Sequence, residues 1–308
     1  MGRFVIGVDA GGTSTRARCV ALDGTRLGVG RSGGANPHAH SPQRAAEQLG
    51  IAITHAMDGL DPADLAAMVI GLAGRSALDD PTVANTLAEL WTRLRLAVTP
   101  RIVNDYEVGF AAATTASSGS VLVAGTGSVA ARIIDYRAAG TSGGWGWLLG
   151  DEGSAFWLGR AAVRATLRNL QVCAPKSPLC TAVLETAELV GRPADTTAER
   201  LIRQVNATAP IALSCYAAAV TATAADPLSA AILHEATRHL IDLLRSTRAP
   251  EEDTPIVLLG GLIGPGGPLS ERVGNLLRRR FRGTVLRTGD GAQGAVRLAL
   301  LQQAGELP

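Results

Sequence analysis

One pattern, an apolar strand followed by a glycine turn and a second strand, occurs twice in this chain at an offset of about 115 residues. The first copy covers residues 4–22, with the turn Asp-Ala-Gly-Gly-Thr at 9–13. The second covers residues 120–135, with the turn Gly-Thr-Gly-Ser at 125–128. A repeat of this kind predicts two related α/β lobes. The matched pairs are Ile6 with Val121, Val8 with Val123, Gly12 with Gly127, and Thr13 with Ser128.

Strands alternate with helices after the first repeat, which predicts a partly parallel sheet. Buried strands are expected at residues 67–72 and 101–104. Helices are expected after Ser41 and Asp80, because each of these capping residues is followed by proline.

The second half of the chain is predicted to be largely helical. Asp151, Asp226 and Asp290 are expected at helix N-termini. A late buried strand is expected at residues 254–259. The small polar stretch at 114–119 marks a boundary between an N-terminal lobe, residues 1–116, and a C-terminal lobe, residues 117–308.

Composition narrows the class of protein. With 308 residues, 46% hydrophobic and 18% charged, the chain is too apolar to be intrinsically disordered. The net charge of +2 argues against nucleic-acid binding by bulk electrostatics. No run of about 18 apolar residues lacks a charge or a proline, and Asp9 precedes any signal-peptide core. We therefore expect a soluble, cytoplasmic protein with no nucleic-acid or membrane partner.

Cysteine and lysine usage excludes several site types. The cysteines form no Cys-x-x-Cys pair, which makes structural zinc or a disulfide framework improbable; they are Cys19, Cys173, Cys180 and Cys215. Lys176 is the only lysine, and it lies in no Walker A loop. A Gly-x-Gly-x-x-Gly fingerprint is absent after the first strand, which argues against a Rossmann fold. If the chain binds ATP, it does so without a catalytic lysine.

The two glycine turns are candidate phosphate-binding sites. Each exposes backbone N–H groups that suit an anion, and each carries a hydroxyl side chain. Asp9, at the end of the first strand, suits Mg²⁺ held through water. For either turn alone, an ordinary hairpin is the alternative. Two such turns at matched places favour a pair that clamps a polyphosphate.

Asn104 and Asp105 follow an expected strand between the two glycine turns. A carboxylate there can accept a proton from a substrate hydroxyl. Phosphoryl transfer needs little further covalent chemistry, since positioning and charge stabilisation dominate. The alternative for Asp105 is a helix cap, and the two roles are compatible.

The segment Gly-Gly-Trp-Gly-Trp-Leu-Leu-Gly-Asp-Glu-Gly-Ser at 143–154 is the most unusual in the chain. Tryptophan faces and carboxylates suit sugars, and glycines let a backbone approach a ligand closely. Asn36, in a polar loop, can add a sugar contact, and the glycines at 260–261 can lie against a purine. The alternatives are a structural loop with aromatic anchors, a plain surface loop, and a strand-to-helix turn.

Together these motifs resemble the N-acetylglucosamine kinase group of the sugar-kinase, Hsp70 and actin superfamily, which also contains activator ATPases. The resemblance covers essentially the whole chain. Its most specific part is Gly-Asp-Glu-Gly-Ser-Ala at residues 150–155. It implies two ribonuclease-H-like lobes with the active site in the cleft between them. It also implies that the last helix, residues 290–303, packs back on the N-terminal lobe.

The resemblance further implies a role for each motif. Asp105 is the implied general base on the sugar 6-hydroxyl, and Asp9 is the implied Mg²⁺ ligand. The implied phosphate-binding residues are Gly11, Gly12, Thr13, Thr126 and Gly127. The implied sugar-binding residues are Asn36, Asn104, Gly144, Trp145 and Asp151, and Gly260 and Gly261 are implied beside the adenosine. The expected ligands are an amino sugar, ATP and Mg²⁺, with a homodimer as the candidate assembly.

Two positions depart from the group. Val129 stands where N-acetylglucosamine kinases tend to carry Asn, and Ala73 stands where they often carry Ser. Losing such a partner leaves a ligand group unpaired, at a cost of roughly 1–3 kcal/mol. Glucosamine is therefore expected as the preferred substrate, with its ammonium drawn to a carboxylate such as Asp151 or Glu107. N-acetylglucosamine is the alternative.

Two other functions are kept open. An activator ATPase needs cysteines for an iron–sulfur cluster between subunits, and Cys173 and Cys180 are the only nearby pair. A sugar-sensing regulator needs a DNA-binding module, for which the first strand at Phe4 is expected to leave no room.

Overall fold

The computed structural model describes residues 2–172, 177–191 and 193–307. Cys173 and Lys176 lie outside the described residues. Contacts divide the chain into two compact units. Unit 1 comprises Met1–Gly119, Ile133–Ala139 and Thr288–Pro308, and unit 2 comprises Ser120–Arg132 and Gly140–Arg287. The lobe boundary expected after residue 116 stays a prediction, because these units are defined by contacts and not by independent folding.

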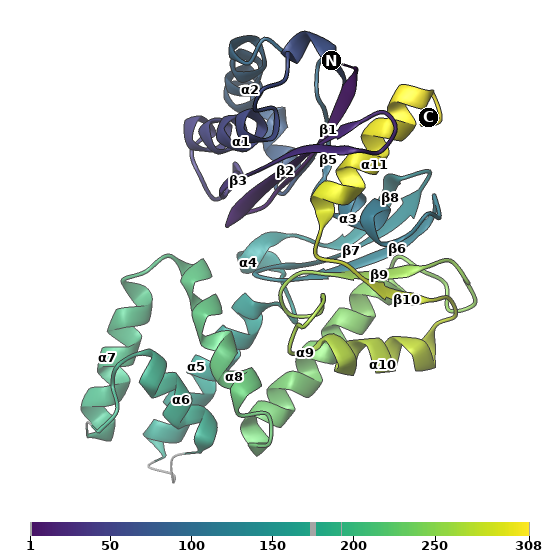
Figure 1. Ribbon diagram of the computed structural model, residues 1–308. Helices are drawn as coiled ribbons and strands as arrows, with labels where there is room; N and C mark the ends of the chain where they lie inside the picture. The colour runs from purple at the N-terminus through teal and green to yellow at the C-terminus, as the bar shows by residue number, and fades with distance from the viewer. Residues whose placement is uncertain (1, 173–176, 192, 308) are drawn as a thin grey trace. The chain divides into compact units, whose positions relative to one another are not determined.

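Unit 1 is built on a five-stranded sheet with the order β3-β2-β1-β4-β5 (Figure 1). Strands β1, β2 and β3 form an antiparallel meander, and β1, β4 and β5 are parallel. The strands are β1 Phe4–Ala10, β2 Ser14–Ala21, β3 Arg26–Gly33, β4 Leu65–Leu72 and β5 Arg101–Asn104. The carboxyl ends of the parallel strands therefore place residue 9, residue 73 and residue 105 at one edge of the sheet.

Helices cover both faces of this sheet because β1 is apolar on both sides. Phe4, Ile6 and Val8 pack with α1 and α2, whereas Val5 packs with α3 and α11. The helices are α1 Pro42–Ala56, α2 Pro81–Arg93, α3 Asp105–Ala113 and α11 Gly291–Ala304, with 3₁₀ turns η1 Pro62–Asp64 and η2 Arg75–Asp79. Ser41, Asp80 and Asp290 each accept a backbone N–H at a helix start, which confirms these predicted caps.

Two glycines let α11 approach the sheet and α3 at backbone distance. A Cβ at Gly7 of β1 would overlap the backbone nitrogen of Val296, and one at Gly294 would overlap the carbonyl oxygen of Val108. The last helix therefore packs on β1 and α3 within unit 1. This packing brings Gly291 beside Asp9 at the end of β1.

The second five-stranded sheet, β10-β9-β6-β7-β8, belongs to unit 2 except for its residues at 119 and 133–139, which are grouped with unit 1. Its strands are β6 Gly119–Ala124, β7 Ser128–Ile134, β8 Arg137–Gly143, β9 Ile256–Leu259 and β10 Val285–Arg287. β9 is parallel to both β6 and β10. Taken from β8, the order is 8-7-6-9-10, which repeats the order 3-2-1-4-5 of unit 1. The structure thus confirms the repeat predicted from residues 4–22 and 120–135.

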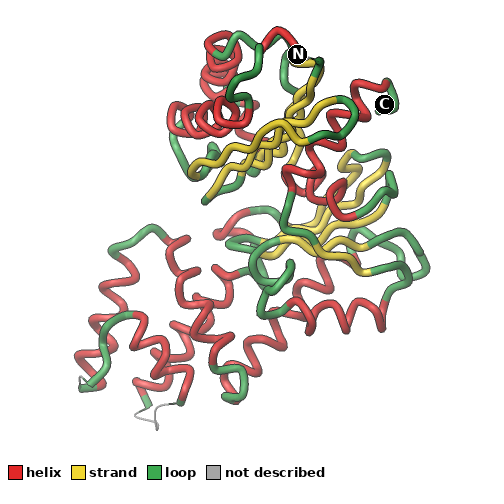
Figure 2. Tube along the Cα trace, viewed as in Figure 1, coloured by secondary structure: helices red, strands yellow, loops and turns green. Residues whose placement is uncertain are grey.

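The chain between β8 and β9 is helical, as Figure 2 shows. Here the predicted helix start at Asp151 is wrong. The helix begins after Ser154, whose hydroxyl accepts from the N–H of Trp157, while Asp151 lies in a loop with φ +61°. The helices are α4 Gly146–Leu149, α5 Ala155–Gln171, α6 Pro178–Thr186, α7 Ala194–Asn206, η3 Pro210–Tyr216, α8 Ala217–Ala222 and α9 Pro227–Arg245, and α10 Ser270–Arg280 follows β9.

Asp226 is the predicted cap of α9, and it also binds a second helix. Its Oδ1 accepts from the N–H of Leu228, and its Oδ2 accepts from the N–H of Leu179 at 2.8 Å. One carboxylate therefore joins the starts of α9 and α6.

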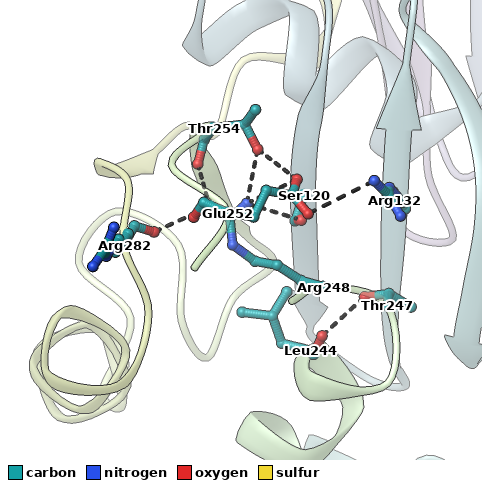
Figure 3. Close-up of polar contacts among 8 residues, drawn as sticks. All are labelled: Ser120, Arg132, Leu244, Thr247, Arg248, Glu252, Thr254 and Arg282. Carbon is teal, nitrogen blue, oxygen red and sulfur yellow. Dashed lines mark hydrogen bonds and ion pairs between the residues drawn. The ribbon is translucent and has the colours of Figure 1, made fainter. Parts of the chain in front are cut away.

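A buried arginine ties together the amino ends of β6 and β9 (Figure 3). The Arg248 guanidinium donates to the hydroxyls of Ser120 and Thr254 and to the carbonyl oxygens of Glu252, Thr254 and Arg282. Its Nη1 also lies 3.5 Å from the Glu252 carboxylate. This network lies at the opposite strand ends from the glycine turn at 125–128.

Within the described parts of the chain, no single helix is long and apolar enough to cross a bilayer. One pair, Pro210–Ala222 with Pro227–Arg245, meets the length and composition criteria jointly but is bent by 116°.

Candidate active site

The first glycine turn joins β1 to β2 and leaves open space for a ligand. The N–H of Gly11 bonds to the carbonyl oxygen of Ser14 at 3.0 Å, which closes the turn. Gly12 and Thr13 are exposed, and a Cβ at Gly12 would meet no atom within 4 Å. Exposed N–H groups beside such open space suit a phosphate.

Asp9, immediately before this turn, is half-buried among other carboxylates. Burial and the negative charge of Asp105 raise its pKa to about 6, against the opposing effect of Arg16. Asp290 raises it further, and the N–H of Gly291 lowers it. The Asp290 carboxylate itself pairs with Arg18. Asp9 thus carries a negative charge that the protein alone stabilises poorly.

Asp105 is the first residue of α3, and Asn104 takes the N-cap position. The capping residue of this helix is therefore Asn104 and not Asp105, one residue earlier than the alternative considered above. Asp105 Oδ1 accepts from the N–H of Tyr106 at 3.0 Å. Burial is the main cause that raises the pKa of this carboxyl. A raised pKa and a place at a strand end suit a group that accepts a substrate proton.

Glu107 is a buried carboxylate and, with Asp151, one of the two candidates named above to attract the sugar ammonium. Its Oε2 accepts from the backbone N–H and the side-chain amide of Asn104, at 2.6 and 3.3 Å. Its Oε1 accepts from the N–H of Ala138 at 2.7 Å. Both oxygens are thus engaged, and Glu107 positions Asn104 and the start of α3. The Asn-x-x-Glu spacing of a capping box was the available signal.

The residues around Asp9 fit a hydrated Mg²⁺ ion. Mg²⁺ prefers oxygen ligands and is usually held by one or two carboxylates together with waters and substrate phosphates. Asp9 and Asp105 supply two carboxylates at the carboxyl ends of β1 and β5, which flank β4, and they are close enough for Asp105 to raise the pKa of Asp9. No group of three or more His, Cys, Asp or Glu side chains in the described residues is arranged to hold a metal alone.

Asn36 lies in the loop between β3 and α1, with its amide fixed by its own loop. Its Oδ1 accepts from the N–H of His38 at 2.8 Å, which leaves the amide NH₂ group as the donor for a ligand. Gly74, at φ +75°, packs against this amide, and a Cβ there would overlap Oδ1. The His38 ring bonds to the Ser76 hydroxyl at 3.0 Å.

In unit 2, the turn at 125–128 is held by the start of α5. The carbonyl oxygens of Gly125 and Thr126 accept from the N–H groups of Ala155 and Phe156, at 2.8 and 3.2 Å. A Cβ at Gly127 would lie 2.6 Å from Oδ1 of Asp151. Glycine is therefore required where the turn rests on this carboxylate.

Asp151 is buried beneath this turn. Its Oδ1 accepts from the N–H of Ser128 at 3.0 Å, and the Ser128 hydroxyl donates to the carbonyl oxygen of Glu152. Burial is the main cause that raises the pKa of Asp151. Oδ1 is thus engaged in holding the turn, and Oδ2 is the oxygen with which Asp151 can meet a ligand.

The segment at 143–150 is hydrogen-bonded to Ser128 as well. The N–H of Gly144 donates to the carbonyl oxygen of Ser128 at 2.9 Å. Trp145 is 67% exposed, so its ring face is available to a ligand. The second tryptophan, Trp147, instead meets Phe156 edge-on at 6.1 Å between ring centroids. Trp145 is thus the tryptophan suited to a sugar.

Gly260 and Gly261 follow β9 and lie beside the same turn. Gly260 has φ +92°, and a Cβ there would overlap the carbonyl oxygen of Ala124. The N–H of Leu262 bonds to that oxygen at 3.0 Å. Each unit therefore gathers its own share of the predicted residues: Asp9, Gly11, Gly12, Thr13, Asn36, Asn104 and Asp105 in unit 1, and Thr126, Gly127, Gly144, Trp145, Asp151, Gly260 and Gly261 in unit 2.

Two sheets of one strand order, each with a glycine turn after its first strand, define the class: the actin-like ATPase fold shared by sugar kinases. The chain belongs to the BadF/BadG/BcrA/BcrD ATPase family, whose model matches residues 6–299. The resemblance inferred from the motifs is thereby confirmed.

Several relatives are named as amino-sugar kinases. N-acetyl-D-glucosamine kinase of Dictyostelium discoideum is 26% identical over 314 residues, covering 96% of this chain and 97% of the relative. N-acetylmuramic acid/N-acetylglucosamine kinase of Clostridium acetobutylicum is 27% identical, and the match spans 61% of each chain. Glucosamine kinase of Vibrio cholerae is 28% identical over 59% of this chain and 60% of its own length.

Solved structures support the same fold. A proposed N-acetylglucosamine kinase from Chromobacterium violaceum superposes with a TM-score of 0.76 at 27% identity, covering 97% of this chain and 99% of the other. A glucokinase from Streptomyces griseus, solved with glucose and an ATP analogue, gives 0.56 at 17% identity over 96% and 99% of the two chains, a likeness of fold alone.

Proposed function

We propose that this protein is an ATP-dependent hexosamine kinase that phosphorylates the 6-hydroxyl of an amino sugar, with glucosamine as the preferred substrate. Family membership supports ATP as the donor. The relatives named above support an amino sugar as the acceptor, but they divide between N-acetylglucosamine and glucosamine. Because a kinase works where ATP is supplied, we also propose a cytoplasmic location.

In this proposal Asp105 accepts the proton of the 6-hydroxyl as the sugar oxygen attacks the γ-phosphorus. The bond from that phosphorus to the ADP oxygen breaks in line, so that sugar 6-phosphate and ADP form. Mg²⁺ bound through Asp9 would neutralise charge on the phosphates. The two glycine turns hold the phosphates through their backbone N–H groups, and Gly260 and Gly261 lie beside the adenosine.

Each unit supplies groups that suit a sugar. The Asn36 amide donates to a sugar oxygen, while the free Oδ2 of Asp151 accepts from a hydroxyl or ammonium group. Trp145 covers an apolar face of the pyranose ring. Asn104 and the backbone at Gly144 complete the set.

The preference for glucosamine rests on one observation above all. The methyl groups of Val129 face the segment that carries Trp145, since a Cβ at Gly144 would lie 3.2 Å from Val129 Cγ2. An acetamido group placed there meets hydrocarbon and loses a hydrogen bond. Ala73, whose N–H bonds to the carbonyl oxygen of Ala10, likewise offers no side-chain donor beside the first glycine turn.

The test is an ADP-release assay with Mg·ATP, reported as kcat/KM for glucosamine, N-acetylglucosamine, N-acetylmannosamine and glucose. We expect glucosamine to lead. Val129→Asn should then move the ratio toward N-acetylglucosamine by about tenfold, the worth of one hydrogen bond to a buried group. Val129→Leu, similar in size but apolar, is the matched control. A wild-type preference for N-acetylglucosamine would overturn the choice of sugar and leave the kinase assignment standing.

A further inference from the structure

The loop between β3 and α1, residues 34–40, is joined to the first glycine turn by two hydrogen bonds. The N–H of Ala35 donates to the carbonyl oxygen of Gly11 at 2.9 Å. Nε2 of His40 lies 2.8 Å from the carbonyl oxygen of Gly12. Because a carbonyl oxygen only accepts, Nε2 must carry the hydrogen. Two consecutive carbonyls of the turn are thus held by this loop.

The contact between loop and turn is close. A Cβ at Gly34 would overlap the carbonyl oxygen of Gly12 and lie 2.7 Å from Nε2 of His40. Any side chain at position 34 would therefore separate the loop from the turn. The loop follows directly on β3, so the strand fixes one end of it.

The other end of the loop is equally firm. His40 directly precedes Ser41, the N-cap of α1, and α1 buries Ala45, Leu49 and Ile53 against the sheet. The backbone of His40 is thus anchored at the start of a packed helix, while Nε2 of its ring contacts the turn.

Asn36 lies in the sequence between Ala35 and His40, the two residues that bond to the turn. A second histidine, His38, bonds to Asn36. The Asn36 amide is bonded by the N–H of His38, whose ring bonds to Ser76 beyond the end of β4. The loop thus offers two histidines in alternate positions: the His40 ring bonds to the glycine turn, whereas the His38 ring bonds to Ser76. This pair separates coupling to the turn from attachment of the loop to Ser76.

We propose that His40 is a positioning residue that couples nucleotide binding at the first glycine turn to sugar binding at Asn36. This inference rests on the proposed function, since it takes the turn as the phosphate site and Asn36 as a sugar ligand. Phosphates that accept hydrogen bonds from the N–H groups of the turn also orient its carbonyl oxygens. Through its hydrogen bond to Gly12, His40 transmits this change of orientation to the loop. By linkage, the sugar must affect nucleotide affinity by the same factor.

The experiment measures the glucosamine dissociation constant with and without a saturating, non-hydrolysable ATP analogue and Mg²⁺. Four proteins are compared: wild type, His40→Ala, His40→Gln and His38→Ala. We expect the analogue to tighten glucosamine binding at least about fivefold in wild type. In His40→Ala this ratio should fall to within about twofold of one. His40→Gln restores part of it, because the glutamine amide places an N–H near the position of Nε2.

His38→Ala is the matched control. It removes the bond between the ring and Ser76 but keeps the backbone N–H that bonds to Asn36, so the ratio between the two conditions should be preserved. A general loss of loop structure would not preserve it. The His40 inference is overturned if His40→Ala keeps the wild-type ratio, or if wild type shows no coupling while phosphorylating glucosamine. Failure of the proposed function is distinct, since wild type would then phosphorylate no amino sugar at all.

Discussion

At the level of single residues, the chemistry is concentrated in two carboxylates at one edge of the first sheet. Asp9 lies near the end of β1 and Asp105 follows β5, with β4 between these strands. The charge of Asp105 contributes to the raised pKa of Asp9. A buried pair of this kind is costly in the absence of a cation. The pattern predicted both residues, whereas their mutual effect depends on the parallel pairing of β1, β4 and β5.

Replacing Asp105 by Asn tests its assignment as general base. Asn keeps the size of the side chain but cannot take the proton. We expect kcat to fall about 10²–10⁴-fold with little change in ATP affinity. Steady-state kinetics with the preferred sugar, together with ATP titration, provide the measurement. A variant that retains full activity would remove Asp105 from this role.

Asp9 predicts a specific pH dependence of stability. Its pKa of about 6 in the folded protein lies above the ordinary 3.8, so the folded state binds more protons than the unfolded state between these values. The contribution of Asp9 to folding is therefore full below about pH 3.8 and is lost as pH rises through about 6. The test compares the free energies of unfolding of wild type and Asp9→Asn in metal-free buffer. As the pH rises through this window, wild type should lose stability relative to the variant. A constant difference from pH 4 to 7 would contradict the assigned pKa.

For the secondary-structure elements, local signals placed most of the helix starts that we predicted, and contacts between elements explain the failure at Asp151. Asp226 and Asp290 cap helices as predicted, but Asp151 does not. Its carboxylate is drawn instead to the N–H of Ser128, 23 residues earlier in the chain. A capping preference acts over three residues and cannot anticipate a partner on another strand.

Arg248 should be essential for the stability of unit 2 and dispensable for chemistry. Arg248→Met leaves the acceptors on Ser120, Thr254 and Glu252 without their buried donor. We expect a loss of about 3–5 kcal/mol in the free energy of unfolding. Activity well below the unfolding transition should be kept, because the network lies at the amino ends of β6 and β9 and the glycine turns follow carboxyl ends.

The matched control for this arginine is Arg238→Met. Arg238 is half exposed and pairs with Asp242 along α9, so its loss should change stability by about 0.5 kcal/mol or less. Urea unfolding of both variants makes the comparison. Equal effects at the two positions would show that burial of Arg248 is not what matters.

At the scale of the whole molecule, the duplicated sheet places one glycine turn in each unit. In the proposed kinase, phosphoryl transfer requires a correctly placed acceptor. We expect saturating glucosamine to raise the rate of ADP release about 10²-fold or more over the rate without sugar, since a positioned hydroxyl reacts far better than a loosely held water.

Equal rates with and without sugar would instead favour the activator ATPase. That alternative needs accessible cysteines for its cluster, yet Cys180 is fully buried in the core of unit 2. Cys173, the other member of the pair, lies outside the described residues. An iron-containing preparation is the additional sign that would accompany this outcome.

The amino-acid pattern alone was enough to predict the repeated strand–turn–strand units, most of the helix caps that we expected, and the residues of the two glycine turns. These features depend on apolar periodicity and turn chemistry, which act over a few neighbouring residues. The folded structure was needed to show that Glu107 binds Asn104 and Ala138, that Gly7 and Gly294 let α11 approach the first sheet, and that His40 contacts Gly12. Each of these depends on atoms brought together from distant positions in the chain, and no local pattern records such a distance.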